Sequence, residues 1–99
     1  LEAMAAGTAV VLPRAGGVLA YADDGNAWLA EPGPSGLAAA IRRALAAGGT
    51  SPILERARRT AHAHAWPLVI GRYLAALEAL HDARLAQLVA ARRYDTARP

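Results

Sequence analysis

The segment Leu1–Gly17, with the sequence LEAMAAGTAVVLPRAGG, decides the fold class of this chain. Residues 1–6 are strong helix formers, and Gly7 stands where a helix commonly ends in the left-handed conformation. Residues 8–12 follow as a nearly continuous apolar run rich in β-branched side chains. Such a run is typical of a strand buried on both faces, as in a parallel sheet. A helix, a glycine and a buried strand in this order predict one half of a βαβ unit.

A loop and a second strand are expected next. Residues 13–17 form a loop at the carboxyl end of the first strand, where open α/β sheets bind ligands. The glycine pair of this loop permits either close approach of a ligand or a plain tight turn. One helical turn over residues 18–22 and turn chemistry in residues 23–26 lead to a second short apolar run at residues 27–30.

The first long helix is predicted between two loop signals. Ser35 is its expected N-cap, and Gly48 follows its end. Arg42 and Arg43 are expected to point away from the core. Its buried face is predicted by helical spacing to carry Leu37, Ile41, Ala44 and Leu45.

Two further helices complete the chain. The pair Ser51-Pro52 predicts a capped helix start, with an end near Ala63. Trp66 is expected to act as a packing anchor at the start of the last helix, and residues 94–99 to form a frayed tail. The last helix carries one apolar stripe, made of Trp66, Val69, Ile70, Tyr73, Leu74, Leu77 and Leu80 and extended by Leu85 and Leu88.

The predicted fold class is α/β: a partial Rossmann-like subdomain with two short parallel strands and a long C-terminal helix. Two strands of parallel type do not make a sheet with two covered faces. We therefore expect the missing strands upstream, with this chain as the C-terminal piece of a larger domain. Residues 1–65 would form the α/β part, and residues 66–99 a helix and tail packing back on it.

The amino-acid composition and charge of the chain restrict the classes of partner that it can bind. Of the 99 residues 55% are hydrophobic, but 27 are alanine, so the core is thin. There is no cysteine, which excludes disulfides and thiolate metal sites. The net charge is +3, and the basic C-terminal half suits phosphate-rich ligands or an anionic membrane surface, with a solvated helix face as the alternative. Nucleic acid is not an expected partner. His62, His64 and His81 lack the spacing of a metal site.

The ordered motifs resemble the donor-binding half of GT-B glycosyltransferases, in particular the large retaining family called GT4. The resemblance covers nearly the whole chain, up to about residue 80. The family's run of motifs is matched by Glu2-Ala3-Met4-Ala5, Gly7, Val10-Val11, Gly16-Gly17, Asn26 to Leu29, Pro32-Gly33, Leu37 to Ile41, Ala57-Arg58 and Trp66. Departures from its pattern are Ala9, Ala20, Ala27 and the pair His64-Ala65.

The resemblance implies roles for four residues. Glu2 matches the second glutamate of the family's E-x7-E motif, which accepts hydrogen bonds from the ribose hydroxyls; the first would lie eight residues upstream. An ionised carboxylate can accept two such bonds at once. Leu1 is the remaining position near the donor diphosphate, and Gly16 and Gly17 would approach the sugar or the phosphates. Ala20 stands where many members carry an acid, which loosens the inference for that loop.

The implied function is part of a retaining, hexosyltransferase-like enzyme. It would transfer a sugar from a nucleotide-diphosphate donor of the UDP or GDP class to a hydroxyl acceptor, with no bound metal and no cofactor. The catalytic groups would lie upstream, so no catalytic residue is assigned here and the chain alone should be inactive. A cytoplasmic location is expected, with peripheral contact to the inner face of the membrane left open. The alternatives are a helical interaction module that docks through residues 66–88, and another Rossmann-type nucleotide binder.

Overall fold

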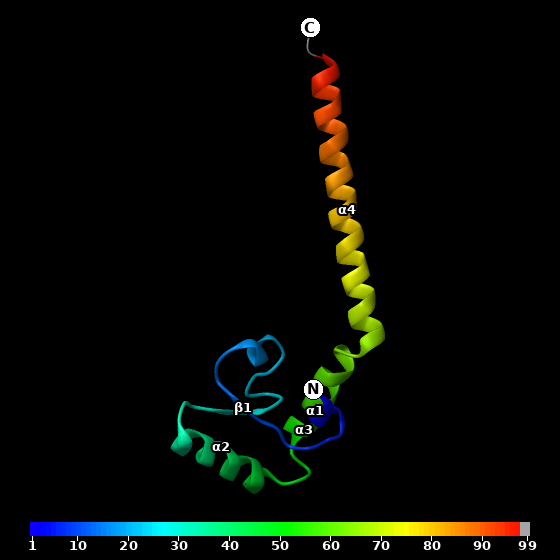
Figure 1. Cartoon of the computed structure of the whole chain (residues 1–99). Coiled ribbons are helices and arrows are strands. Elements are labelled where there is room, and N and C mark those ends of the chain that lie inside the picture. Colours follow the sequence, from blue (N-terminus) through cyan, green and yellow to red (C-terminus); the bar gives the residue numbers. More distant parts are fainter. Residues whose placement is uncertain (98–99) are drawn as a thin grey trace. The chain divides into compact units, whose positions relative to one another are not determined.

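The computed structural model describes the backbone of residues 1–97 and the side chains of residues 1–94. Its contacts divide the chain into two units, Leu1–Ala65 and Trp66–Pro99. In chain order (Figure 1) the elements are α1 (Glu2–Ala5), β1 (Val11–Pro13), the 3-10 helix η1 (Gly17–Ala20), β2 (Trp28–Ala30), α2 (Pro34–Ala47), α3 (Pro52–Ala63) and α4 (Trp66–Ala97). The chain therefore mixes helices with strands, as its sequence predicts.

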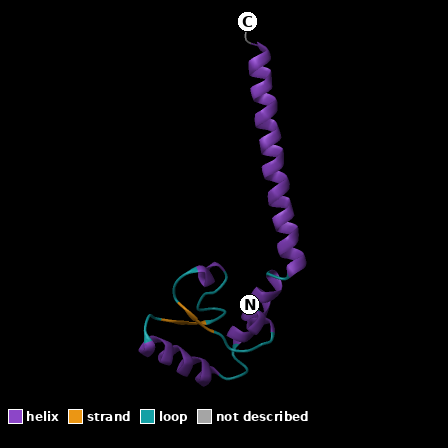
Figure 2. Cartoon of the chain, in the orientation of Figure 1, coloured by secondary structure: helices purple, strands orange, loops and turns teal. Residues whose placement is uncertain are grey.

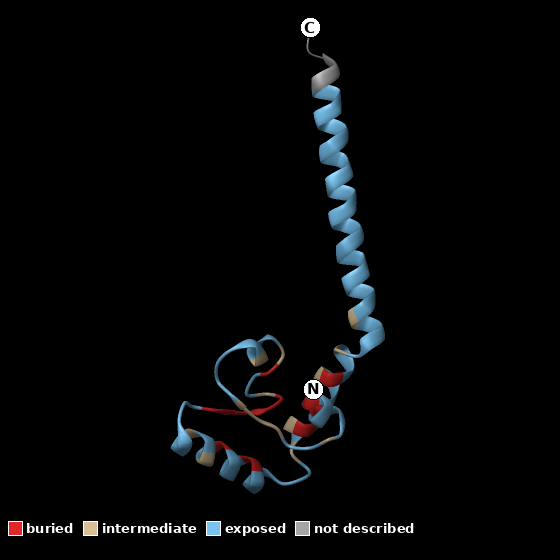
Figure 3. Ribbon diagram, viewed as in Figure 1, coloured by how far each residue is buried: buried red, intermediate tan, exposed pale blue. Residues whose placement is uncertain are grey.

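The two strands form a parallel sheet in the first unit (Figure 2). Val11 lies opposite Trp28, and Pro13 opposite Ala30. All three residues of β2 are buried, as expected of a strand covered on both faces (Figure 3). The first strand is shorter and later than the predicted residues 8–12, because the ladder extends only where β2 lies opposite.

The end of α1 follows its sequence signal. Gly7 adopts a φ of 78°. Its N–H donates to the carbonyl of Met4 at 3.1 Å, and the N–H of Thr8 donates to that of Ala3 at 3.0 Å. These two bonds make a Schellman motif, which satisfies carbonyls that the helix end leaves open.

Both faces of the sheet carry a small apolar cluster. On one face Leu29 packs with Met4 of α1 and with two alanines of α3. On the other, Trp28 packs with Leu54 and with Ala44 of α2. Met4 is the one large side chain that is fully buried within residues 1–94, so the core is as thin as the alanine content predicts.

The start of α2 differs from the prediction. Its N-cap is Gly33, at a φ of 92°, and not Ser35. Pro34 occupies the first helical position, where its fixed φ suits the helix and its missing N–H costs nothing. The predicted end at Gly48 is confirmed.

The buried face of α2 agrees with the prediction only in part. Ala44 is buried as predicted and Ala40 is buried as well, while the larger predicted side chains are exposed: Leu37, Ile41 and Leu45. The reason is the close approach of the helix to the chain that follows β2. A Cβ on Gly36 would lie 2.7 Å from the carbonyl carbon of Glu31. Only small side chains fit beneath a helix held so close.

The start of α3 is confirmed. Ser51 accepts a hydrogen bond from the N–H of Ile53 at 3.3 Å, and Pro52 begins the helix, which ends at Ala63.

The second unit is α4, and one expectation for it is wrong. Trp66, its first residue, is 76% exposed, and its role as a packing anchor against the first unit stays a prediction. The helix runs through Tyr94 to Ala97, with no frayed tail in that stretch. Arg98 and Pro99 lie outside the described residues. Along the stripe the side chains are exposed, apart from the half-buried Val69. The packing of residues 66–99 on the first unit stays a prediction.

Within residues 1–97, no helix combines the length and the apolar character that crossing a membrane requires.

Candidate functional site

A crevice lies at the carboxyl ends of the two strands. Because β1 and β2 are parallel, both end at the same edge of the sheet, which is where open α/β sheets bind ligands. The crevice has a volume of about 500 Å³, within the usual range for ligand sites. Its wall is mostly apolar and is formed by Val11, Leu12, Pro13, Arg14, Ala15, Ala30, Glu31, Pro32, Gly33, Pro34 and Leu37.

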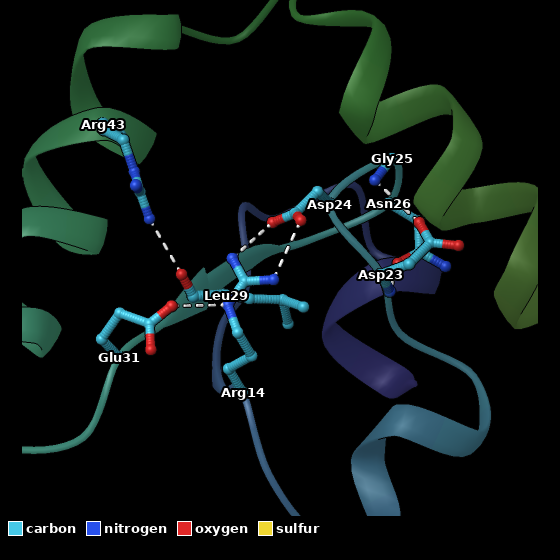
Figure 4. A network of polar contacts seen from close by, with 8 residues as sticks. All are labelled: Arg14, Asp23, Asp24, Gly25, Asn26, Leu29, Glu31 and Arg43. Atoms are coloured by element: carbon cyan, nitrogen blue, oxygen red, sulfur yellow. Dashed lines mark hydrogen bonds and ion pairs between the residues drawn. The ribbon is translucent and has the colours of Figure 1, made fainter.

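Arg14 is the centre of the polar contacts at this edge (Figure 4). Its two terminal nitrogens donate to both carboxylate oxygens of Asp24, at 2.9 and 3.0 Å. Its Nε lies 2.8 Å from Oε1 of Glu31. One guanidinium thus joins the residue after β1, the turn before β2 and the residue after β2.

The charges in this group shift its ionisation. The hydrogen bonds from Arg14 hold the pKa of Asp24 below its usual value, against a smaller opposing effect of desolvation. The same contact raises the pKa of Arg14. One cation faces two carboxylates, so a phosphate group would have to displace Asp24 or Glu31 to reach Arg14.

The bridge between Arg14 and Asp24 closes the loop that carries the glycine pair. Gly16 adopts a φ of 82°, and both Gly16 and Gly17 are exposed with open space beside the Cα atom. The backbone of this loop is therefore accessible, which fits both alternatives drawn from the sequence, close approach of a ligand and a plain tight turn. Neither glycine lines the crevice, although Ala15, the residue before them, does.

Glu2 and Leu1 lie apart from the crevice. Both are exposed, and α1 packs on α3 rather than on the strand ends. In the part of the chain that the structure describes, the carboxylate of Glu2 has no ion-pair partner, which leaves both oxygens open to solvent. The four predicted donor-binding residues are thus accessible, but within the described part of the chain no hydrogen bond or ion pair brings Glu2 together with the glycine loop.

Arg43 closes the outer edge of the sheet. It donates to the backbone carbonyl of Leu29 at 2.8 Å, and the expectation that it points away is wrong (Figure 4). The N–H of Trp28 donates to the carbonyl of Val10, the residue before β1, so the neighbouring Leu29 directs its carbonyl to the opposite side. The long arginine side chain satisfies this carbonyl, which blocks the edge of β2.

A second, polar hollow lies beside the turn at residues 23–26. It has a volume of about 370 Å³. Its central residue, the buried Asn26, donates to the carbonyl of Tyr21 at 2.8 Å and to the hydroxyl of Thr60 at 2.9 Å, and accepts from the N–H of Asp23 at 2.9 Å. These groups satisfy one another's hydrogen bonds, so the residues beside the hollow form a structural network that joins the turn to α3.

The cluster of Arg14, Asp24 and Glu31 was missed by the sequence reasoning. A signal was present, because Glu31 directly follows the second predicted strand, Arg14 comes two residues after the first, and the ends of parallel strands share one edge of a sheet. Opposite charges at those two positions predict an ion pair there.

Comparison of the chain with protein-family models, with curated proteins and with solved structures gives no match. Residues 1–94 also hold no group of three or more side chains suited to binding a metal. The functional interpretation therefore depends on the residues of this chain.

Proposed function

We propose that this chain contributes to the donor site of a retaining glycosyltransferase that uses a UDP- or GDP-linked sugar. The observation that carries the proposal is the crevice at the shared carboxyl edge of two parallel strands, flanked by an exposed glycine loop. The acceptor would be a hydroxyl group. The resemblance of the ordered motifs to the GT4 family supports the choice of donor.

The ribose and the diphosphate–sugar part of an extended donor each have a candidate contact. Glu2 would accept hydrogen bonds from the ribose, for which its exposed, unpaired carboxylate is suited. The backbone at Gly16 and Gly17 would lie against the diphosphate or the sugar, where side chains would obstruct it. A nucleotide sugar has separate base, ribose, diphosphate and sugar parts, so Glu2 and the loop need not touch each other.

The test is the affinity of the chain for UDP- and GDP-linked sugars, measured by isothermal titration calorimetry. The variant Glu2→Ala should weaken binding by about 1.5–3 kcal/mol, the range for hydrogen bonds to a charged group. Glu78→Ala, which removes an exposed glutamate from α4, is the matched control and should leave the affinity unchanged. Equal affinity of the Glu2 variant and the parent chain would remove Glu2 from the site.

The chain alone should transfer no sugar, because no residue in it is assigned to catalysis. Detection of transfer by the purified chain would contradict this part of the proposal.

A second candidate function is a helical interaction module. It is favoured by one observation, the exposure of the apolar stripe of α4. Absence of donor binding, together with association through α4, would favour this candidate over the first.

A further inference from the structure

The exposed stripe of α4 contains apolar residues at the spacing of a coiled-coil seam. Its apolar residues alternate at spacings of four and three, which is the pattern of seam positions in paired helices. The seam comprises Trp66, Ile70, Tyr73, Leu77 and Leu80. These side chains are between 45% and 76% exposed, so a partner would find them accessible.

Arg84 continues the same spacing and interrupts the apolar character of the seam. It follows Leu80 by four residues and Trp66 by eighteen, which is about five full helical turns, so it points in the same direction as Trp66. It is exposed and forms no ion pair with any residue in the described part of the chain. The orientation of a partner helix decides what this cation meets.

A parallel pair of α4 helices would place Arg84 opposite its own copy. Two like charges facing each other at a seam position repel, which disfavours this orientation. An antiparallel pair can instead place the aromatic ring of Trp66 opposite the guanidinium of Arg84, an attractive cation–π contact. In this antiparallel register Trp66 lies opposite Arg84, Ile70 opposite Leu80, and Tyr73 opposite Leu77. Each pair occurs twice, because the two helices are identical.

We propose that α4 associates antiparallel with α4 of a second copy of this chain, with Trp66 of each copy stacked on Arg84 of the other. A second copy is the occupant that fits, because both members of every pair belong to this one helix. The seam side chains and the adjacent Leu74 would bury on the order of 600 Å² per helix, and the total exceeds the roughly 1,000 Å² that a specific interface needs. The proposal does not depend on the proposed donor site.

Cysteine cross-linking of the full chain tests the orientation, since the chain has no cysteine of its own. Two variants, Ile70→Cys and Leu80→Cys, are oxidised separately and as a mixture in which one carries an affinity tag. The antiparallel register predicts tagged–untagged dimers in the mixture and none from either variant alone. Identical residues would then be ten positions apart, about 15 Å along the axis and beyond the reach of a disulfide. Cross-linking of each variant with itself would overturn the proposal.

Sedimentation equilibrium over a range of concentrations tests the role of Arg84. Arg84→Ala should weaken the dimer about two- to fivefold, as expected for loss of one cation–π contact. Arg72→Ala, which removes a charge away from the seam, is the matched control and should change the association little. Circular dichroism checks that both variants keep their helix. A stronger dimer in Arg84→Ala would indicate the parallel orientation and overturn the proposal. A chain that stays monomeric at every concentration would overturn it too. Binding of such a monomer to vesicles of anionic lipid would not rescue the proposal.

Discussion

Replacing Gly36 by alanine should destabilise the first unit, although the same change stabilises most helices. Gly36 lies in the first turn of α2, against the chain that follows β2. An added Cβ would lie 2.7 Å from the carbonyl carbon of Glu31, 3.1 Å from its Cα, and closer still to its oxygen. These are backbone atoms that cannot rotate aside, so the start of α2 must move away from the edge of the crevice.

The magnitude follows from two opposing effects. Overpacking of a tight contact costs about 1–3 kcal/mol, and the higher helix propensity of alanine returns about 0.5–1 kcal/mol. The difference between these ranges is about 0–2.5 kcal/mol. We expect a loss near the middle, about 1 kcal/mol in the free energy of unfolding, or about 4–8 °C in Tm for a unit of this size.

The assay is urea unfolding followed by the fluorescence of Trp28, a residue of β2 that is buried against Ala44 of α2 and Leu54 of α3. A background of Trp66→Phe removes the signal of the second tryptophan, which is exposed. Gly71→Ala is the matched control, because no atom lies within 4 Å of the Cβ that it adds. Gly71→Ala should leave this transition unchanged and raise helix content. A Gly36→Ala variant as stable as its parent would refute the close approach of α2 to Glu31.

Three further changes test the supports of the fold by the same unfolding measurement. Gly7→Ala should cost roughly 1–2 kcal/mol, because alanine is strained in the left-handed conformation of this position, while the half-exposed guanidinium of Arg58 beside the new Cβ can move aside; an unchanged transition would contradict the left-handed conformation of Gly7. Asn26→Ala should cost about 1–3 kcal/mol, because its buried hydrogen-bond partners lose their bonds, and an unchanged transition would mean that water replaces them. Because Arg14 lowers the pKa of Asp24 from 3.8, their contact stabilises the fold above that pH and is lost as the pH falls through the lower folded value. The variant Asp24→Asn should therefore flatten the acid limb of the stability profile, and an unaltered limb would contradict the pairing.

Local chemistry predicted the ends of the helices well. A left-handed glycine after α1, the Ser51-Pro52 pair before α3 and the glycine after α2 each act within a few residues of their own position. The Pro34 start of α2 was missed because two cap signals compete there. Gly33 can adopt a positive φ, and proline is better suited than Ser35 to the first turn.

Burial could not be predicted in the same way. Helical spacing predicted Ala44 correctly as part of the buried face of α2, but the predicted Leu37 and Ile41 are exposed and Ala40 is buried instead. The start of α2 lies close to the backbone after β2, where a Cβ on Gly36 would overlap the carbonyl group of Glu31. Periodicity identifies which residues share a side of a helix, but burial depends on a neighbouring surface that periodicity does not specify.

The candidate site was predictable in position more than in chemistry. The order of helix and strands placed a ligand edge at residues 13–17, and residues 13–15 line the crevice. The pairing of Arg14 with both carboxylates depends on the register of two strands and on the turn at residues 23–26. The spacing of charged residues along the sequence does not determine the register of the two strands.

The most direct test of the central claim is an NMR titration of the ¹⁵N-labelled chain with UDP- and GDP-linked hexoses. We expect saturable shifts of the amide resonances of Glu2 and of residues 14–17 with one of the two donors. An absence of shifts with either donor, or shifts confined to α4, would contradict a donor site at this edge of the sheet.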